Sequence, residues 1–486
     1  MIPFGEWLPD QASIGNQGAN EAKNVIPRTP RSYGPCYAIQ EIGNALTAYC
    51  QGAGSFRGIG GTLFVTAGDA NKLYSFSANT WSDISRLAGG AYAVSTDDQW
   101  SFAPFGDNIV AVNGTDVPQV FQIGSSSNYA ALSGSPPVAR FAITVKDFLV
   151  LGRITSAQNK VRWSAINDIT SWTIGTNQAD DQDLPAGGKV MGGIGGEFGT
   201  WFCENSIYRQ QYVGGSLIFT FDRISEDRGC CAENSLAAFE QTSFGLDWDG
   251  FFALQGGREF TPIGDQKVDR WFWNRVNQSY LNRVHGSVDP INRLYVVAFP
   301  STASTTGTPD TIMWYNWSIG RWSYSEQAVD VLFQALTNTS YHTDNVDTLL
   351  GNTDATSVPA DSSLFIGEGN AKFGAFSTGK KLATFEGAAL EGIIGTTEAP
   401  LVEDRRSLVS EIWPIGDGGT LSVSVGYRNL PNEGITWTDY VSQNATGFCP
   451  FGIDARFLQA RVKIAAGGTW THQQGIRPKT HRTGMY

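Results

Sequence analysis

The stretch MWYNWSIGRWSYSE, residues 313–326, places a run of aromatic residues before a turn at Gly320 and a second run that starts at Arg321. LYSFSANTWSDIS, residues 73–85, repeats this arrangement early in the chain. One such stretch predicts a β-hairpin, because glycine supplies the positive φ of a tight turn and aromatic side chains favour a pleated surface. Two of them, far apart in one chain, predict a repeated β unit.

Similar groups of short strands recur between residues 58 and 385, with alternating apolar residues and turns that contain Asp-Asn, Asp-Gly or Gly-Gly. About six groups follow one another at intervals of about 40–50 residues, which is the spacing of propeller blades. In a β-propeller each four-stranded blade buries its faces against its neighbours, so the large side chains of 313–326 are expected to pack between blades. The predicted fold is therefore all-β, a β-propeller with an additional small β-sandwich or sheet domain.

The two ends of the chain depart from this pattern. Residues 1–57 are rich in proline and alternate little, which predicts an extended N-terminal arm that packs with the C-terminal domain. Residues 58–385 are predicted to form the propeller. Residues 386–486 alternate cleanly and predict a C-terminal β-sandwich or platform, ending in a basic, irregular tail from residue 475 that we expect at the surface or between subunits.

The composition of the chain limits the classes of function that we expect. The 486 residues carry a formal charge of −12 with a sequence pI of about 4.9, so long-range attraction to nucleic-acid phosphates is absent. The six cysteines form no CxxC pair, and we expect reduced thiols. The N-terminus has neither the basic start nor the apolar core of a signal peptide. No apolar run reaches the ~20 residues of a membrane span, so none is expected.

Few residues in the sequence suggest a metal-binding or catalytic role. Asp180, Asp181 and Asp183 in NQADDQD are candidates for a loop that holds a cation such as Ca²⁺, and a solvated turn is the alternative. STDDQWSF, residues 95–102, resembles the Asp box of sialidases but lacks its glycine and is not repeated. GDQKVDRWFWNRV, residues 264–276, predicts one of the few short helices. We predict no catalytic residue, no cofactor-binding residue and no cofactor, hence no enzyme.

The order of several phrases along the chain is similar to that of tail proteins of short-tailed bacteriophages. The phrases are GEWLPDQ, AKNVIPRT, GDANKLYSF, WSFAPFGDNIVAVNG, RFAITVKDFLVLG, VRWSAINDITSWT, DLPAGG, IYRQQYVG, IFTFDRISEDRGC, IGDQKVDRWF and DRRSLVSEIWPIGDG. The chain resembles the tail hub or nozzle family, also called tail accessory factor, packaged-DNA stabilisation protein or tail tubular protein B. The resemblance covers most of the chain, and its motifs have no catalytic content.

This resemblance implies a structural virion subunit, made in the host cytoplasm and built into the tail. It implies a homo-hexameric ring below the portal and adaptor proteins, with distal tail or fibre proteins as further partners. The ring would continue the channel for double-stranded DNA, retain the packaged genome and let it pass at ejection without reading its sequence. The chain has no room for the large insertions of longer nozzle proteins, which leaves direct attachment of fibres open.

The rival interpretation is a carbohydrate-binding or carbohydrate-degrading β-propeller, which needs an aromatic pocket and, for catalysis, paired carboxylates. A ring subunit instead needs large interfaces and a channel wall that does not hold DNA. In that case we expect acidic residues to outnumber basic residues toward the ring axis, and the basic tail around Arg477, Lys479 and Arg482 to face a neighbouring protein.

Overall fold

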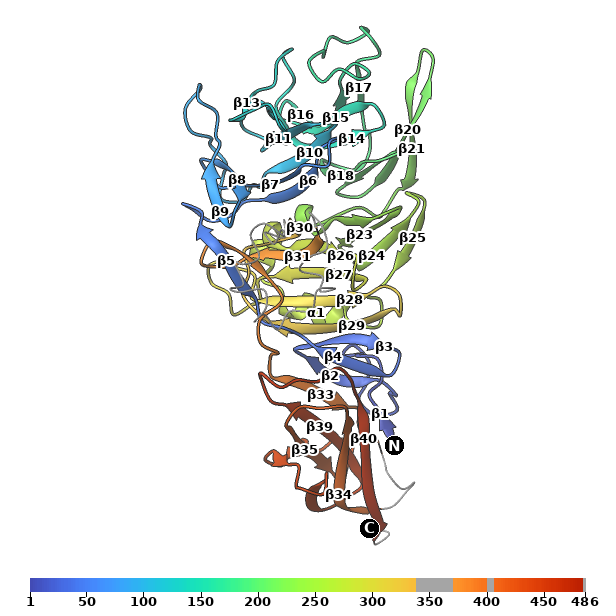
Figure 1. Cartoon of the computed structure of the whole chain (residues 1–486). Coiled ribbons are helices and arrows are strands. Elements are labelled where there is room, and N and C mark those ends of the chain that lie inside the picture. Colours follow the sequence, from blue (N-terminus) through green and yellow to red (C-terminus); the bar gives the residue numbers. More distant parts are fainter. Residues whose placement is uncertain (338–369, 400–405, 484–486) are drawn as a thin grey trace.

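Seven four-stranded units lie around one axis in the described part of the chain (Figure 1). The structure is a computed structural model and describes residues 1–337, 370–399 and 406–483. The innermost strands follow one another around the axis, and the innermost strand of the seventh unit contacts that of the first. The chain is thus an all-β propeller with seven blades, one more than the about six units that the strand spacing predicts.

The first five blades are complete stretches of the chain and pair their strands in order. Their strands are β6 to β9 (Ala53–Arg57, Leu63–Gly68, Leu73–Ser77, Thr80–Asp83), β10 to β13 (Ser101–Phe105, Asn108–Val112, Gln119–Gln122, Ala130–Ala131), β14 to β17 (Ala139–Val145, Phe148–Ile154, Ala157–Trp163, Asp180–Asp183), β18 to β21 (Val190–Ile194, Gly199–Cys203, Ile207–Gly214, Ile218–Ser225) and β22 to β25 (Ala237–Phe239, Thr242–Asp247, Gly250–Gln255, Glu259–Pro262).

The stretch 313–326 forms most of the outer half of the sixth blade. This blade consists of β26 to β29 (His285–Asp289, Leu294–Phe299, Thr311–Asn316, Arg321–Glu326). Trp322 is fully buried, packs at 4.6 Å from Tyr315 and 5.0 Å from Phe251 of the fifth blade, and its Nε1 donates to the Ile263 carbonyl at 2.9 Å. The aromatic hairpin therefore packs one blade against the next, as its sequence predicts.

The seventh blade is built from both ends of the propeller segment. Its strands are β30 (Val331–Thr337), β31 (Asn370–Phe376), β32 (Lys381–Thr384) and, outermost, β5 (Gln40–Ala45). The predicted boundary at residue 58 is therefore wrong, because β5 and β6 belong to blades and not to an arm. Residues 338–369 of the predicted propeller lie outside the described residues.

The first 35 residues and the C-terminal region together form a stem below the propeller (Figure 1). One sheet has the order β3-β4-β40-β34-β38, with β1 beside β40, and a second runs from β29 through β2, β33, β39 and β35 to β36, with β37 beside β35. The strands are β1 (Ile2–Pro3), β2 (Ala19–Lys23), β3 (Val25–Thr29), β4 (Ser32–Pro35), β33 (Gly392–Thr396), β34 (Ser407–Gly416), β35 (Leu421–Arg428), β36 (Thr436–Trp437), β37 (Val441–Ser442), β38 (Cys449–Ala455), β39 (Phe457–Ile464) and β40 (Gln473–Arg482).

The end of the chain is more regular than its sequence predicts. Residues 473–482 form the long strand β40, which pairs with β34 along most of its length. Ile476 is buried while Arg477 and Lys479 are exposed. The prediction of an irregular tail is wrong here, because proline and basic residues hide the alternation while the partner strand supplies the backbone hydrogen bonds.

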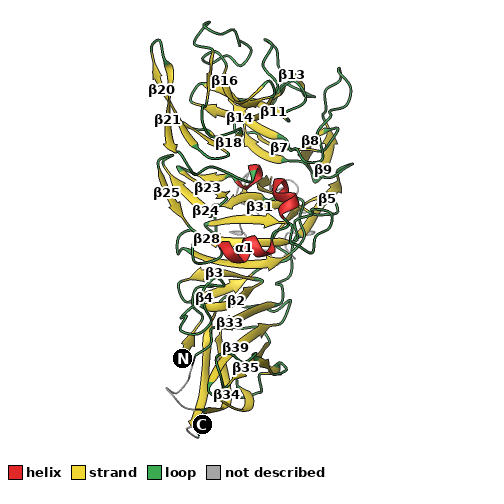
Figure 2. Cartoon of the chain, turned by 180° about the vertical axis from the view of Figure 1, so that it is seen from behind, coloured by secondary structure: helices red, strands yellow, loops and turns green. Residues whose placement is uncertain are grey.

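Helices are short and few in the described ranges. They are α1 (Asp269–Arg275) and the 3₁₀ turns η1 (Glu233–Ser235) and η2 (Gln278–Arg283), and Figure 2 shows all three in the propeller half. The short helix predicted within 264–276 is confirmed as α1. No helix of the described residues has the length and apolar character needed to cross a membrane.

Candidate functional site

A pocket of about 180 Å³ lies where the segments that lead into the innermost strands converge. Its polar lining comes from four different blades or the turns before them, and the pocket also has several glycines in its wall. The polar side chains are Gln99, Ser101, Arg140, Glu233, Asn234 and His285. We call this region the axial mouth, because the innermost strands of a propeller surround its central channel.

An ion-pair cluster dominates the axial mouth. Arg140, whose side chain is 5% exposed, lies 3.3 Å from Glu233 through its Nη2 and 3.5 Å from Asp98 through its Nε. Arg153 pairs with the other carboxylate oxygen of Glu233. Burial lowers the pKa of Arg140, while Glu233 and Asp98 oppose this shift. Two arginines and two carboxylates therefore neutralise one another.

A β-bulge directs Arg153 to this cluster. The pairing of β15 with β16 shifts register between Gly152 and Ile154, and Arg153 has a left-handed φ of 52°. A bulge changes the direction of a side chain in this way. A Cβ on Gly152 would overlap the Trp201 ring, so the packing of the fourth blade against β15 needs glycine there.

The segment 95–99 closes the axial mouth. It leads into the second blade, yet Asp97 accepts a hydrogen bond from Asn282 Nδ2 at 3.1 Å and the Thr96 carbonyl accepts one from Arg283 at 3.2 Å. Both donors precede the sixth blade, which lies three blades away around the ring. The segment therefore reaches across the axis and covers this end of the central channel.

His285 also holds this segment. Its Nε2 lies 2.9 Å from Gln99 Oε1, so the ring donates to the amide oxygen. Burial lowers the pKa of His285 to about 4, which keeps the imidazole neutral near pH 7. Its Nδ1 has no hydrogen-bond partner. The contact is thus neutral and does not depend on charge at neutral pH.

The predicted cation residues do not form a loop. Asp180, Asp181 and Asp183 lie on β17, the outer strand of the third blade. Lys160 Nζ lies 3.2 Å from Asp181 and 3.4 Å from Asp183, so an ammonium group occupies the place of a cation. Among the described residues, no three His, Cys, Asp or Glu side chains gather as a metal site. The prediction of a cation-binding loop is therefore wrong, because these residues lie on a strand and two of them already pair with Lys160.

Little in the sequence pointed to the axial cluster. Arg140 is the second residue of the apolar strand β14, and Glu233 precedes the strand β22. Their 93-residue separation in the chain hides the pairing. The Asp-box-like stretch did single out part of the closing segment, although its role is a different one. All six cysteines are buried and unpaired, and burial raises the pKa of Cys36 to about 12 and of Cys203 to about 11.

No family model and no curated protein matches the chain. Among solved structures it is similar to BBS1N in complex with ARL6DN, with a TM-score of 0.41 and 9% identity over 72% of this chain and 97% of that one. It is also similar to the Pan2 WD40 domain of Neurospora crassa, with a TM-score of 0.36 and 8% identity over 62% of this chain and 90% of that one. These similarities concern the fold alone.

Proposed function

We propose that the protein is a structural, non-catalytic subunit of a bacteriophage tail that forms a hub or nozzle ring below the portal and adaptor. Its sequence phrases are similar to those of tail nozzle proteins, and the joint between propeller and stem is the observation that carries the proposal. Strand β2 pairs with β29 of the sixth blade on one side and with β33 of the stem on the other.

This joint makes one stiff subunit from two bodies. Lys23 of β2 is opposite Tyr324 of β29, and the Asn24 amide donates to the Tyr324 carbonyl at 2.7 Å. Arg321 of the same blade donates to the Thr29 carbonyl at 2.8 Å. A ring subunit has to hold its contact surfaces in fixed relative positions, because a closed ring requires one defined rotation between neighbours.

Because the axial mouth is closed, DNA would not pass along the axis of the propeller. Segment 95–99 crosses the propeller axis, so a DNA channel in the proposed assembly lies between copies of the chain. We expect that wall to carry more acidic than basic residues. Arg477 and Lys479 alternate on the exposed face of β40, and we assign this face to a neighbouring protein.

Electron microscopy of the purified protein, alone and with a portal–adaptor complex, tests the proposal. The expected result is a ring with a lumen wide enough for duplex DNA. The resemblance to nozzle proteins implies six copies of the chain in that ring. Monomers under both conditions would contradict it. Release of reducing sugar from polysaccharide by the purified chain would favour the rival carbohydrate-degrading propeller instead.

A further inference from the structure

A second cavity, of about 340 Å³, lies between the N-terminal arm, α1, the sixth blade and the stem. We call it the stem cleft. Its volume falls at the low end of the roughly 300–1,000 Å³ of small-molecule sites. Two arginines, Arg275 and Arg461, line it together with Trp271 and Trp437.

Aromatic rings hold both guanidinium groups in place. Arg275 lies 4.4 Å from the centre of Trp271, and Arg461 lies 4.0 Å from that of Trp437. Trp271 is itself fixed by Trp7 at 4.8 Å. Stacking of this kind orders an arginine before a ligand arrives, which lowers the entropy lost on binding.

The charges of the cleft are not balanced. Glu21 accepts a hydrogen bond from the Tyr324 hydroxyl at 2.7 Å and lies 3.4 Å from Arg461 Nη2. Arg461 Nε is buried without a hydrogen-bond partner. No carboxylate of the described residues forms an ion pair with Arg275. One positive charge is therefore left over in the cleft.

Neutral polar groups complete the lining, from Asn16, Asn20 and Gln459. Asn16 is bonded within the N-terminal arm, since its Oδ1 accepts from the Gly18 amide at 2.7 Å, and Asn20 Nδ2 donates to Gln459 Oε1. The Oδ1 atom of Asn20 is buried without a partner and remains an acceptor for a hydroxyl group. Amides of this kind suit the hydroxyl groups of a sugar, and a free guanidinium suits a carboxylate. We propose that the stem cleft binds a sugar acid, a pyranose unit that carries a carboxylate. Such binding does not depend on the proposed tail function.

Titration calorimetry of the whole chain with tetragalacturonate tests the proposal, with maltotetraose, a tetraglutamate peptide and inorganic sulfate as comparison ligands. The expected result is binding of tetragalacturonate alone. Arg275→Gln should weaken it roughly tenfold to a hundredfold, because a charge-assisted hydrogen bond is lost. Arg275 is exposed, so this variant is expected to fold.

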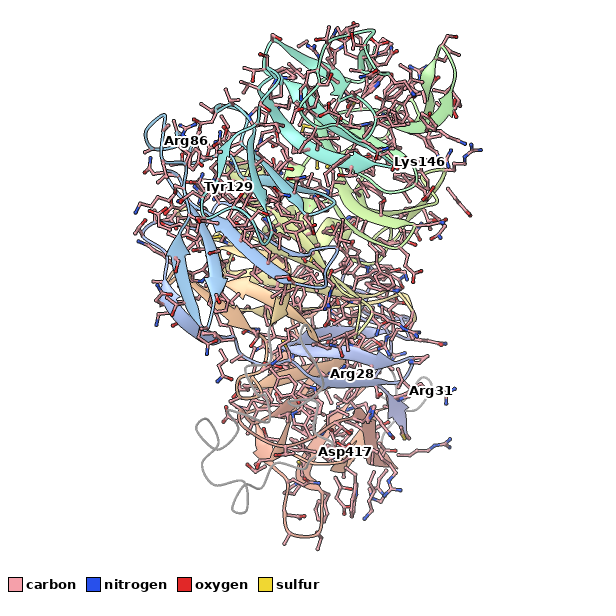
Figure 3. The ribbon with its side chains drawn as sticks, turned by 45° about the horizontal axis from the view of Figure 1, so that its top comes forward. Arg28, Arg31, Arg86, Tyr129, Lys146 and Asp417 are labelled. Carbon is pink, nitrogen blue, oxygen red and sulfur yellow. The ribbon has the colours of Figure 1, made fainter. Side chains whose placement is uncertain are left out.

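Arg31→Gln is the matched control, since Arg31 is an exposed arginine in the turn between β3 and β4 (Figure 3) and is not among the residues that line the cleft. It should bind tetragalacturonate as the unchanged chain does. If maltotetraose bound as tightly as tetragalacturonate, the ligand carboxylate would have no role. If tetraglutamate bound as tightly as tetragalacturonate, the site would not recognise a sugar. Binding of sulfate alone, or of no ligand, would overturn the site.

Discussion

Arg140 and Glu233 are 93 residues apart in the chain and meet at the axial mouth, with Arg140 Nη2 3.3 Å from Glu233 Oε2. Arg140 lies on the innermost strand of the third blade, and Glu233 lies in the turn before the fifth. The pair therefore links the third and fifth blades, which lie on either side of the fourth. Because the arginine is buried, it depends on Glu233 and on Asp98 for its countercharge.

Glu233→Gln should destabilise the protein by about 3 kcal/mol, because it removes the carboxylate that two arginines share. Urea unfolding followed by tryptophan fluorescence measures the change. Glu226→Gln is the control, since Glu226 pairs with Arg223 at the surface with its side chain 76% exposed. This control variant should lower the free energy of unfolding by less than about 1 kcal/mol. Equal losses would show that the axial cluster is no stronger than a surface pair.

Asp269 should make stability fall as the pH rises. Burial, with Asp10, Asp265 and Asp249 nearby, raises the pKa of Asp269 to about 7. The folded chain then holds a proton that the unfolded chain loses near pH 4, so this contribution is full below about pH 4 and is lost toward pH 7.

Asp269→Asn should therefore flatten the decline of the melting temperature between about pH 4 and pH 7. Some decline should remain, because burial also raises the pKa of Asp330 to about 7. Glu197→Gln, at a side chain that is 85% exposed, should leave the profile unchanged. An unchanged profile in Asp269→Asn would refute the assignment.

Gly286→Ala should destabilise the propeller by about 1–3 kcal/mol through overpacking. A Cβ at Gly286 would overlap the Ser235 carbonyl oxygen, which is backbone and cannot move aside alone. Gly452→Ala is the control, because nothing lies within 4 Å of a Cβ there. Thermal unfolding of both variants compares them, and equal melting temperatures would contradict the close approach.

The hairpin of β20 and β21 should contribute to the proposed ring. Val213 is 50% exposed and Leu217 is 69% exposed, and both lie at the tip of this projecting hairpin (Figure 1). Leu217→Asp should reduce ring assembly in analytical ultracentrifugation without lowering the melting temperature. Ile59→Asp, at an exposed residue of another hairpin, is the control. Equal loss in both variants would remove any special role for the β20–β21 tip.

The alternation of the strands and their turn residues were enough to predict the propeller, because these are local features with a period of two. They were not enough to find the seventh blade. Its strands β30 and β31 are separated by residues 338–369, and its outer strand β5 comes from the other end of the propeller segment. A blade closed by distant segments has no local repeat to detect.

Local sequence was sufficient for the all-β class, the aromatic hairpin at 313–326 and the short helix α1, since each depends on neighbours in the chain. Long-range packing was needed to bring segment 95–99 over the axial mouth and Arg140 to Glu233. It also placed Arg275 in a cleft between propeller and stem. These contacts join residues far apart in the chain, and their formation depends on the ring of blades bringing those segments together.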